Sequence, residues 1–210
     1  METTKCKICR RLGNKLFLKG ERCMSPKCAF VRRPYPPGNK GKGRGRRNVS
    51  EYKKELEEKQ KMRNWYNLRE RQFSKYVKQV LEKRGKVEDA GVALIKQIAA
   101  RLDNVVCSLG FAASRPKAKQ LVSHGHFLVN GKRSDIPSYR IKKGDVISVR
   151  PDSRKKEAFK NMAETLKKIK SPAWAQLNAE KLEAKITAEP TFDQSVLPAE
   201  IHAIFEYYSK

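Results

Sequence analysis

Four cysteines lie within twenty-three residues near the N-terminus, in the segment CKICRRLGNKLFLKGERCMSPKC. Cys6, Cys9, Cys23 and Cys28 have the spacing C-x2-C-x13-C-x4-C. Two close pairs joined by a loop can converge on one tetrahedral ion, and the neighbouring lysines and arginines favour the thiolate form that binds metals. We therefore expect a metal site here, with Zn2+ as the ion and a four-cysteine iron–sulfur cluster as the alternative.

Other uses of four thiols fit this sequence less well. The N-terminus, METTKCKICRR, is charged where a secretory signal would be apolar, so we expect a cytoplasmic, reducing location in which disulfides are rare. A redox role would place the C-x-x-C pair in a βαβ pattern, which this segment lacks. The fifth cysteine, Cys107, lies among Val105, Val106 and Leu109 and is expected to be a small buried side chain.

The charge of the chain predicts a polyanionic partner. The 210 residues include 48 Lys and Arg against 22 Asp and Glu, a formal net charge of +26. Residues 1–48 alone contain fifteen Lys and Arg and two Asp and Glu. No apolar run approaches the roughly 18 residues that cross a bilayer. Nucleic acid is therefore the expected partner, and a membrane is not.

Little in the sequence supports catalysis. His124 and His126 flank a glycine at a helix-to-strand turn, a place that suits RNA contact or solvent exposure better than acid–base chemistry. Asp89 and Asp103 have no obvious partner base, and no nucleophile motif is present. We expect neither an enzyme nor a small-molecule substrate.

The first two parts of the chain are a basic arm and a helical region. Residues 1–48 form the arm, which ends in PYPPGNKGKGRGRRN, a stretch too poor in apolar residues to fold alone. Residues 49–98 predict three helices, the first of which begins after Ser50. Their apolar faces are expected to carry Tyr52, Leu56, Met62, Tyr66, Phe73, Val77, Val80, Leu81, Val92, Ile95 and Ile98.

The third part, residues 99–152, predicts a helix-helix-sheet module. One helix is expected in RLDNVVCSLGF and a second, basic helix in SRPKAKQLVSHG, with Ser114 as its cap and Pro116 in its first turn. HFLVNGKRSDI contains a strand and an Asn130-Gly131 turn, which is a strong hairpin signal. GDVISV supplies a further strand.

The fourth part, residues 153–210, is expected to be helical. RKKEAFKNMAETLKKIK is basic and amphipathic, and PAEIHAIFEYYSK carries Ile201, Ile204, Phe205 and Tyr208 at helical spacing. Because positive charge is scarce at this end of the chain, we expect these four side chains to pack onto the helices of residues 50–98.

The module of residues 99–152 closely resembles the RNA-binding module of the small-subunit ribosomal protein S-four family, in the residues RLDNVV and LGFAASRPKAKQLVSHGHFLVNGKRSDIPSYRIKKGDVISV. That module also occurs in pseudouridine synthases, tyrosyl-tRNA synthetases and a heat-shock ribosome-rescue protein. The remaining segments narrow the choice to the bacterial-type S-four family itself: KGERCMSPKCAFVRRPYPPG, EYKKELEEKQKMRNWYNLRERQF and PAEIHAIFEYYSK. The sequence departs from the family's usual pattern at Pro116, where a longer polar residue is common.

The resemblance implies a multidomain α+β fold that is mainly α. It would have an N-terminal metal-binding arm with four cysteine ligands, a discontinuous helical domain closed by residues 153–210, and an inserted helix-helix-sheet RNA-binding module. The implied role is a structural constituent of the small ribosomal subunit that binds the 5′ domain of small-subunit rRNA at a multi-helix junction, nucleates assembly and supports decoding accuracy. The implied neighbours are ribosomal protein S-five and mRNA.

On this interpretation RNA is held through shape and phosphates, because A-form helices hide their base edges in a deep major groove. The side chains expected to contact RNA from the arm are Arg10, Arg11, Lys15, Arg22, Arg32, Arg33, Lys42, Arg44, Arg46 and Arg47. Those expected to do so from the module are Arg115, Lys117, Lys119, Gln120, His124, Lys132, Tyr139 and Arg140.

Two alternatives stay open on the residues. An RNA-modifying enzyme with the same module would need a catalytic domain beyond residue 150, where only about 60 residues remain, which is short for a domain. A DNA-binding zinc-finger regulator would need a recognition helix at its metal site. The stretch between the cysteine pairs, RRLGNKLFLKGER, contains two glycines and is a poor helix.

Overall fold

The computed structural model describes residues 2–38, 50–83, 89–169, 171–191 and 197–209. The chain divides into two compact units, residues 1–94 with 193–210 (unit 1) and residues 95–192 (unit 2). The described part is mainly helical and contains one five-stranded antiparallel sheet. Within these ranges, no helix is both long and apolar enough to cross a membrane.

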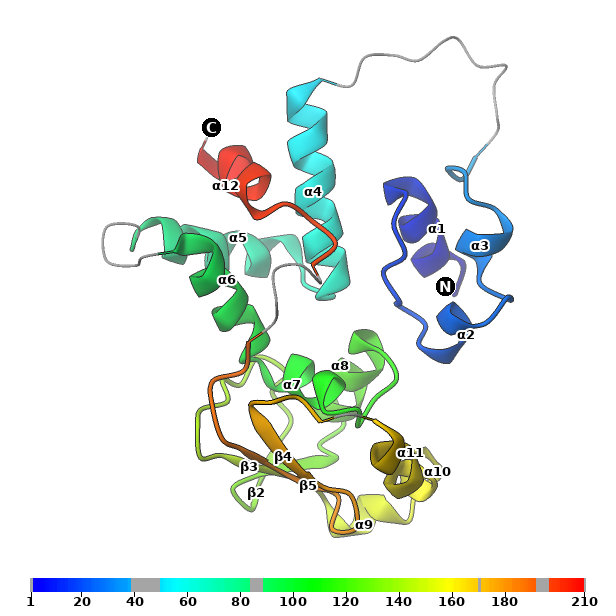
Figure 1. Ribbon diagram of the computed structural model, residues 1–210, viewed down its shortest axis with the longest axis vertical. Coiled ribbons are helices and arrows are strands. Elements are labelled where there is room, and N and C mark those ends of the chain that lie inside the picture. Colours follow the sequence, from blue (N-terminus) through cyan, green and yellow to red (C-terminus); the bar gives the residue numbers. More distant parts are fainter. Residues whose placement is uncertain (1, 39–49, 84–88, 170, 192–196, 210) are drawn as a thin grey trace. The chain divides into compact units, whose positions relative to one another are not determined.

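Unit 1 begins with three short helices that carry the cysteines: α1 (Glu2–Leu12), α2 (Glu21–Met24) and α3 (Ala29–Arg32). Figure 1 shows them grouped together, and α1 contacts α3. Leu16 and Leu18, on the turn between α1 and α2, are buried beside the thiols. This segment therefore has a very small apolar core of its own.

The rest of unit 1 is built from α4 (Glu51–Trp65), α5 (Glu70–Leu81), the first half of α6 (Ala90–Ala99) and α12 (Ile201–Ser209). Met62 on α4 and Phe73 and Val77 on α5 are fully buried. The α12 helix contacts both α4 and α5, so the predicted packing of the last helix onto this region is confirmed. Ile204 is fully buried, whereas Phe205 is only half-buried.

A polar network also fastens α12. The Lys59 ammonium, on α4, is buried, donates to Glu70 Oε1 at 2.9 Å, and lies 4.2 Å from the ring centroid of Tyr207. The Tyr208 hydroxyl donates to the same Glu70 oxygen at 2.7 Å. Burial of a lysine requires such a partner, so the network fixes α12 on α4 and α5 in one register.

Two residues predicted for the apolar faces are exposed. Tyr52 is 55% exposed in the first turn of α4, with its ring 5.6 Å from that of Tyr207, and Val92 is 36% exposed in the first turn of α6. Helical periodicity identifies the buried side of a helix but not how far along the helix the core extends. Ser50 and Ser114 occupy the N-cap positions of their helices as predicted, although neither side chain makes a capping hydrogen bond.

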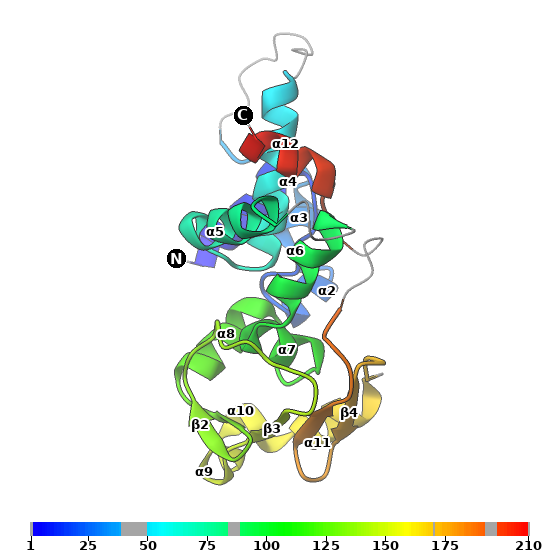
Figure 2. The ribbon, with the colours of Figure 1, turned by 90° about the vertical axis from the view of Figure 1, so that its left-hand side faces the viewer.

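Unit 2 contains α7 (Leu102–Ser108), α8 (Arg115–Ser123) and the sheet, in which every neighbouring pair is antiparallel. Its strand order is β2-β1-β3-β5-β4. The strands are β1 (Phe127–Val129), β2 (Lys132–Ser134), β3 (Val146–Val149), β4 (Ala175–Asn178) and β5 (Glu183–Ile186). The α7 and α8 helices lie beside each other next to this sheet (Figures 1 and 2).

The core of unit 2 follows from the alternation of its strands. Phe127 and Val129 are buried and lie on one face of β1, and Phe127 packs edge-to-face on Phe111 with the ring centroids 5.8 Å apart. The predicted hairpin is confirmed, since β1 and β2 pair around a turn in which Asn130 and Gly131 both have positive φ. The side chains that point away from this core are the ones available to a partner.

The expectation that residues 153–210 are helical and complete the helical domain is wrong for residues 153–186. The predicted amphipathic helix is divided into α9 (Pro151–Arg154), α10 (Glu157–Lys160) and α11 (Met162–Lys168). The β4 and β5 strands follow, and β5 pairs with β3. The alternating burial of Ala184 and Ile186 around exposed Lys185 is the strand signal, but it covers too few residues to stand out in the sequence.

Candidate nucleic-acid interface

The four clustered cysteines line one small cavity in unit 1. Cys6 and Cys9 come from α1, Cys23 from α2, and Cys28 from the N-cap of α3. Cys9, Cys23 and Cys28 are buried and Cys6 is partly exposed. The fold therefore brings together the four residues that the spacing predicted, on three helices separated by turns.

The surroundings of the thiols bear on whether they suit a metal. Burial raises the pKa of the Cys9 thiol, a hydrogen bond with the Leu16 backbone opposes that rise, and the three other thiols add to it. The Lys19 N–H donates to Cys23 Sγ at 3.4 Å, a contact typical of the outer shell of a thiolate site. The described residues contain no group of three or more His, Cys, Asp or Glu already arranged to hold an ion. The donor set is nonetheless one that zinc accepts.

Cys107 behaves as a different kind of cysteine. It lies on α7, partly exposed rather than fully buried as predicted, and packs against the apolar core of unit 2. Burial raises the pKa of its thiol, although the nearby Arg115 charge lowers it. Cys107 therefore lies apart from the four clustered cysteines and is not one of the candidate metal ligands.

The arm cations differ in how exposed they are. Arg10 and Lys15 are half-buried, and the predicted contacts Lys42, Arg44, Arg46 and Arg47 lie outside the described residues. Among the predicted arm contacts that the structure describes, the exposed ones are Arg11, Arg22, Arg32 and Arg33. These four are placed so that a phosphate can reach them without rearrangement of the helices.

Arg10 is partly used within the protein. Its Nε donates to the carbonyls of Arg33 at 3.0 Å and Tyr35 at 2.9 Å, and its guanidinium lies 4.9 Å from the Tyr35 ring centroid. Arg10 thus holds residues 33–35 beside α1, a role that the sequence did not reveal.

The module presents most of its predicted contacts on the surface of unit 2. Arg115 and Lys119, on α8, are half-buried. The exposed ones are Lys117, Gln120, His124, Lys132, Tyr139 and Arg140. They come from α8, from the turn after it, from β2 and from the loop before Ile141, so one folded core fixes cations from several elements.

A left-handed turn at Gly125 separates the two module histidines. Gly125 has φ +68°, and its N–H donates to the Val122 carbonyl at 2.7 Å, which ends α8. His124 is exposed, whereas His126 is buried and its Nδ1 lies 2.9 Å from Ser153 Oγ. The turn therefore sends one histidine to solvent and the other into the core.

Three cations near this turn were missing from the predicted contacts: Arg133 and Lys156, which are exposed, and Arg150, which is half-buried. Arg133 on β2 lies against Gly125, since a Cβ there would be 2.4 Å from Arg133 Nε. Arg150, the N-cap of α9, was expected within the module but not among its RNA contacts, and Lys156 was expected in the separate helical part. The contact between His126 and Ser153, which are distant in the sequence, places both residues beside this turn.

Two acidic residues that looked unpartnered in the sequence are accounted for. Asp103 accepts two hydrogen bonds from the Arg101 guanidinium, at 3.0 Å and 2.7 Å, and both side chains are buried. Asp89 accepts from the Gly91 N–H at 2.7 Å at the start of α6. Both carboxylates therefore have structural partners.

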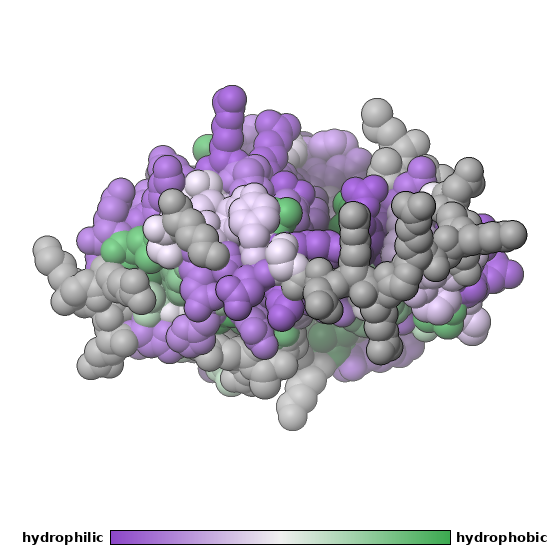
Figure 3. Space-filling view, turned by 90° about the horizontal axis from the view of Figure 1, so that it is seen from above, coloured by the Kyte–Doolittle hydropathy of each residue, from purple (hydrophilic) through white to green (hydrophobic). Residues whose placement is uncertain are grey.

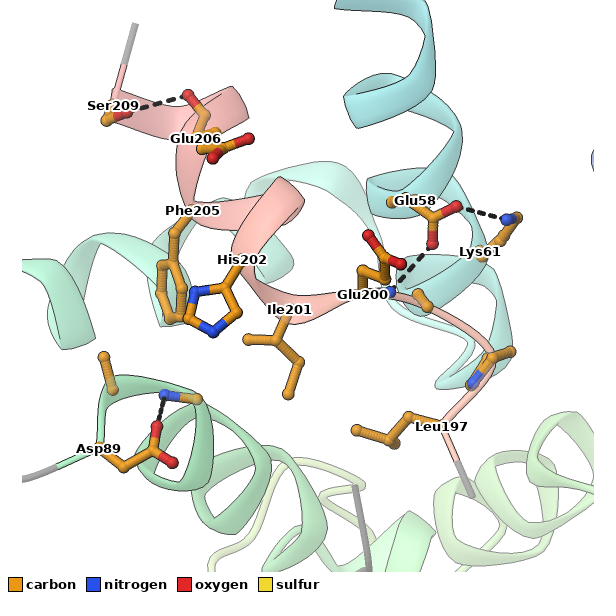
Figure 4. Close-up of a pocket in the computed structure, with 14 residues that line it drawn as sticks. Glu58, Lys61, Asp89, Leu197, Glu200, Ile201, His202, Phe205, Glu206 and Ser209 are labelled. Carbon is orange, nitrogen blue, oxygen red and sulfur yellow. Dashed lines mark hydrogen bonds and ion pairs between the residues drawn. The ribbon is translucent and has the colours of Figure 1, made fainter. Parts of the chain in front are cut away.

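A groove in unit 1 has the opposite charge from the module surface. It lies between α4, the start of α6 and α12, has a volume of about 1170 Å³, and is lined by Glu58, Asp89, Glu200 and Glu206 (Figure 4). Glu58 accepts from the Glu200 N–H at 3.0 Å and pairs with Lys61. A row of carboxylates in a chain of +26 net charge does not fit a phosphate, and it suits a basic partner.

The surface in Figure 3 shows no large apolar area. Hydrophilic side chains cover most of what is coloured on that face, and hydrophobic residues show only as small separate areas. The coloured part of this face therefore offers a partner mainly hydrophilic side chains.

Comparison with known proteins gives one consistent result. A family model described as the ribosomal protein S4/S9 N-terminal domain matches residues 1–96, and the S4 domain model matches residues 100–147. The chain is 51% identical over 205 residues to small ribosomal subunit protein uS4A of Clostridium novyi, which covers 98% of this chain and 96% of that protein. It is 47% identical to uS4 of Caldicellulosiruptor bescii and 45% identical to uS4 of Thermus thermophilus, with the same coverage.

Proposed function

Because the chain belongs to the ribosomal protein S4 family, a structural and non-enzymatic rRNA-binding component of the small ribosomal subunit, we propose how its parts divide that work. Unit 2 selects the shape of the rRNA, the N-terminal arm adds phosphate contacts, and the acidic groove of unit 1 receives a protein. The protein acts in the ribosome, in the cytoplasm. The similarity to uS4 proteins gives no support to an RNA-modifying enzyme or a DNA-binding regulator.

The observation that carries this proposal is the set of exposed cations fixed by the core of unit 2. Lys117, Lys132 and Arg140 come from three elements that one apolar core holds in fixed register. Cations at fixed positions can match the positions of the phosphates in a folded RNA junction. The phosphates of a regular RNA helix have a different arrangement and would fit these cations less well. Such a set of cations suits the target that the family resemblance implied, a multi-helix junction in the 5′ domain of small-subunit rRNA that is bound early in assembly.

The arm contributes charge, and a metal orders it. The four thiols at one cavity and the Lys19 N–H bond to Cys23 fit a Zn2+ ion or an iron–sulfur cluster. A bound metal would fasten α1, α2 and α3 to each other, and Arg22 and Arg32 would thereby be held in position for phosphates.

The acidic groove is the proposed place for ribosomal protein S-five, the neighbour that the resemblance implied. The groove's carboxylates would pair with basic side chains of that protein, and mRNA, the other implied neighbour, would contact exposed cations rather than this groove. Glu206→Lys should weaken binding of purified S-five and leave rRNA binding intact, whereas Glu180→Lys, an exposed site in unit 2, should change neither. If the unchanged chain and both variants bound S-five with the same affinity, the groove would not be the binding site for that protein.

Competition binding tests the main proposal. The chain is bound to labelled 5′-domain rRNA and challenged with a simple RNA hairpin or a DNA duplex over a series of salt concentrations. We expect the rRNA to be preferred at every salt concentration, because shape selectivity does not depend on counterion release alone. Equal competition by all three nucleic acids would contradict shape recognition.

Matched variants separate the arm from the module. Arg22→Ala should weaken binding to every RNA alike and lower the salt slope by about 1. Lys117→Ala should in addition reduce the preference for the junction over the hairpin. If both substitutions lowered the affinities for the junction and for the hairpin by the same factor, the arm and the module would bind RNA as one uniform cationic surface.

A further inference from the structure

The turn of residues 124–126 is surrounded by cations from four separate elements. Lys117 lies on α8, Arg133 on β2, Arg150 directly after β3, and Lys156 at the start of α10. Arg133 lies directly against Gly125. Burial lowers the pKa of His126, and the charges of Lys156, His124, Arg150 and Lys117 lower it further, so these cations lie close enough to act on the His126 ring.

Three contacts hold residues 150–159 against this turn. The Arg150 N–H donates to the His126 carbonyl at 2.9 Å, and His126 Nδ1 lies 2.9 Å from Ser153 Oγ. The His126 ring also packs edge-to-face on Phe159, with the ring centroids 5.6 Å apart. His126 and Ser153 are both buried, so Arg150 and Lys156 are fixed beside the turn by the core rather than carried on a loose tail.

One carboxylate competes for these cations. Arg150 donates to Asp152 Oδ2 through Nε at 3.1 Å and Nη2 at 2.8 Å, and the Asp152 side chain is 74% exposed. Exposed ion pairs of this kind contribute little to stability, so a phosphate can replace Asp152 with little loss. Glu157, next to Lys156, is also exposed.

We propose that the RNA-binding surface of unit 2 extends past Val149, and that an RNA phosphodiester binds at the 124–126 turn between Arg133, Arg150 and Lys156. Two of these three cations lie beyond residue 147, where the match to the S4 domain ends. The proposal rests on the proposed rRNA-binding function. It adds a phosphate site whose cations are positioned by the buried His126–Ser153 contact.

Paired charge variants test this site. The salt dependence of binding to transcribed 5′-domain rRNA is measured for the unchanged chain, for the double variant Arg150→Gln/Lys156→Gln, and for the control Lys167→Gln/Lys185→Gln. The control removes the same charge from exposed positions of unit 2 that do not act on His126. We expect the first pair to lower the slope by about 1 to 2, and the control to change it by much less. Asp152→Asn should raise the affinity.

Chemical labelling gives a second readout on the unchanged chain. RNA should protect Lys117 and Lys156 from an amine-reactive reagent and leave Lys167 and Lys185 reactive, as read by mass spectrometry. Equal slopes for the two double variants, equal labelling of the four lysines, or no gain from Asp152→Asn would overturn the site. If the unchanged chain failed to prefer the rRNA at all, the proposed function itself would be wrong. The two failures are distinguishable, because this result concerns the unchanged chain and the variants test only the phosphate site.

Discussion

The cysteine segment of unit 1 and the core of unit 2 both hold basic side chains in place, but by different means. The cysteine segment buries three thiols with Leu16 and Leu18 and little else. Unit 2 buries a continuous apolar core from two helices and five strands, including Phe111, Phe127 and Ile147. Burial of apolar area stabilises the second region by itself, whereas so small a segment needs a covalent or metal link.

The contrast teaches where each region is vulnerable. The stability of the cysteine segment should depend almost completely on the cysteines that would bind the metal. Any single apolar residue should contribute only weakly to it. The stability of unit 2 should depend instead on its apolar core. Each core substitution should lower the unfolding free energy by an amount that depends on how much of the side chain is buried. Four substitutions would support or overturn this contrast.

The largest effect is expected from Cys23→Ser. Loss of one of four ligands should release the metal, and because structural zinc supplies roughly 10–16 kcal/mol of apparent binding energy, α1 to α3 should lose their order. Elemental analysis measures the metal, and amide exchange measures the order of each segment. Unit 2 should keep its protection. Cys107→Ser is the matched control and should retain one metal per chain; freshly isolated protein with neither zinc nor iron would end the metal proposal.

Phe127→Ala should have the next largest effect, now in unit 2. Its ring is fully buried against Phe111 and Phe159, so truncation should cost about 3–5 kcal/mol of unfolding free energy. Denaturant unfolding measures the loss, and the metal content should not change. Ile136→Ala, at a site that is 55% exposed, should cost far less. Similar losses at both positions would show that unit 2 does not rely on its core.

Gly125→Ala should have a smaller effect that reaches RNA binding. A left-handed alanine costs about 1–2 kcal/mol, and its Cβ would displace the Arg133 guanidinium. Gly131→Ala shares the positive φ, at +78°, but has no atom within 4 Å of the added Cβ. Both variants should therefore lose stability in thermal melts, and only Gly125→Ala should also weaken rRNA binding through Arg133. Equal binding by the two would mean that Arg133 does not contact RNA.

The smallest effect concerns the Glu70 network in unit 1. Partial burial would raise the Glu70 pKa, but hydrogen bonds from Tyr208 and Lys59 and the charges of Lys59 and Arg63 hold it below its usual 4.5. The carboxylate therefore stabilises the fold above that pH, and the contribution disappears as the pH falls through the lowered pKa. Since the side chain is 41% exposed, the effect should stay below about 1 kcal/mol.

Glu70→Gln should reduce the loss of stability below pH 4.5, as measured by unfolding at several pH values. Burial and the hydrogen bond to Glu70 raise the Tyr208 pKa, so this hydroxyl remains a donor throughout the range. Glu57→Gln, which removes an exposed carboxylate paired with Lys53 at 3.9 Å, is the control and should leave the acid dependence unchanged. Identical profiles for the two variants would remove Glu70 from the explanation.

Sequence reasoning succeeded where a pattern is local. The Asn130-Gly131 hairpin, the two helices before it and the helical spacing of the last helix each follow from a few neighbouring residues. The gathering of the four thiols was predicted from their spacing, although metal binding itself stays a prediction.

Sequence reasoning failed where pairing is distant. The β5 strand joins β3 across thirty-odd residues, and nothing local in Glu183–Ile186 specifies that partner. The same distance concealed Arg150 and Lys156, because their place beside Gly125 depends on a buried contact between His126 and Ser153. Likewise, Arg10 looked like a free cation until residues 33–35 were seen to fold back onto it.

The interruption of unit 1 by unit 2 has a consequence for biosynthesis. The chain is made from its N-terminus, so all of residues 95–192 are synthesised before α12. Until then, Lys59 on α4 lacks the rings of Tyr207 and Tyr208, and α4 and α5 lack their third helix. A module that has already folded reduces the entropic cost of bringing α12 back to α4 and α5, because most of the residues between them are then no longer free to move. The order of translation thus favours a nascent protein whose RNA-selecting part is complete before its helical part is closed.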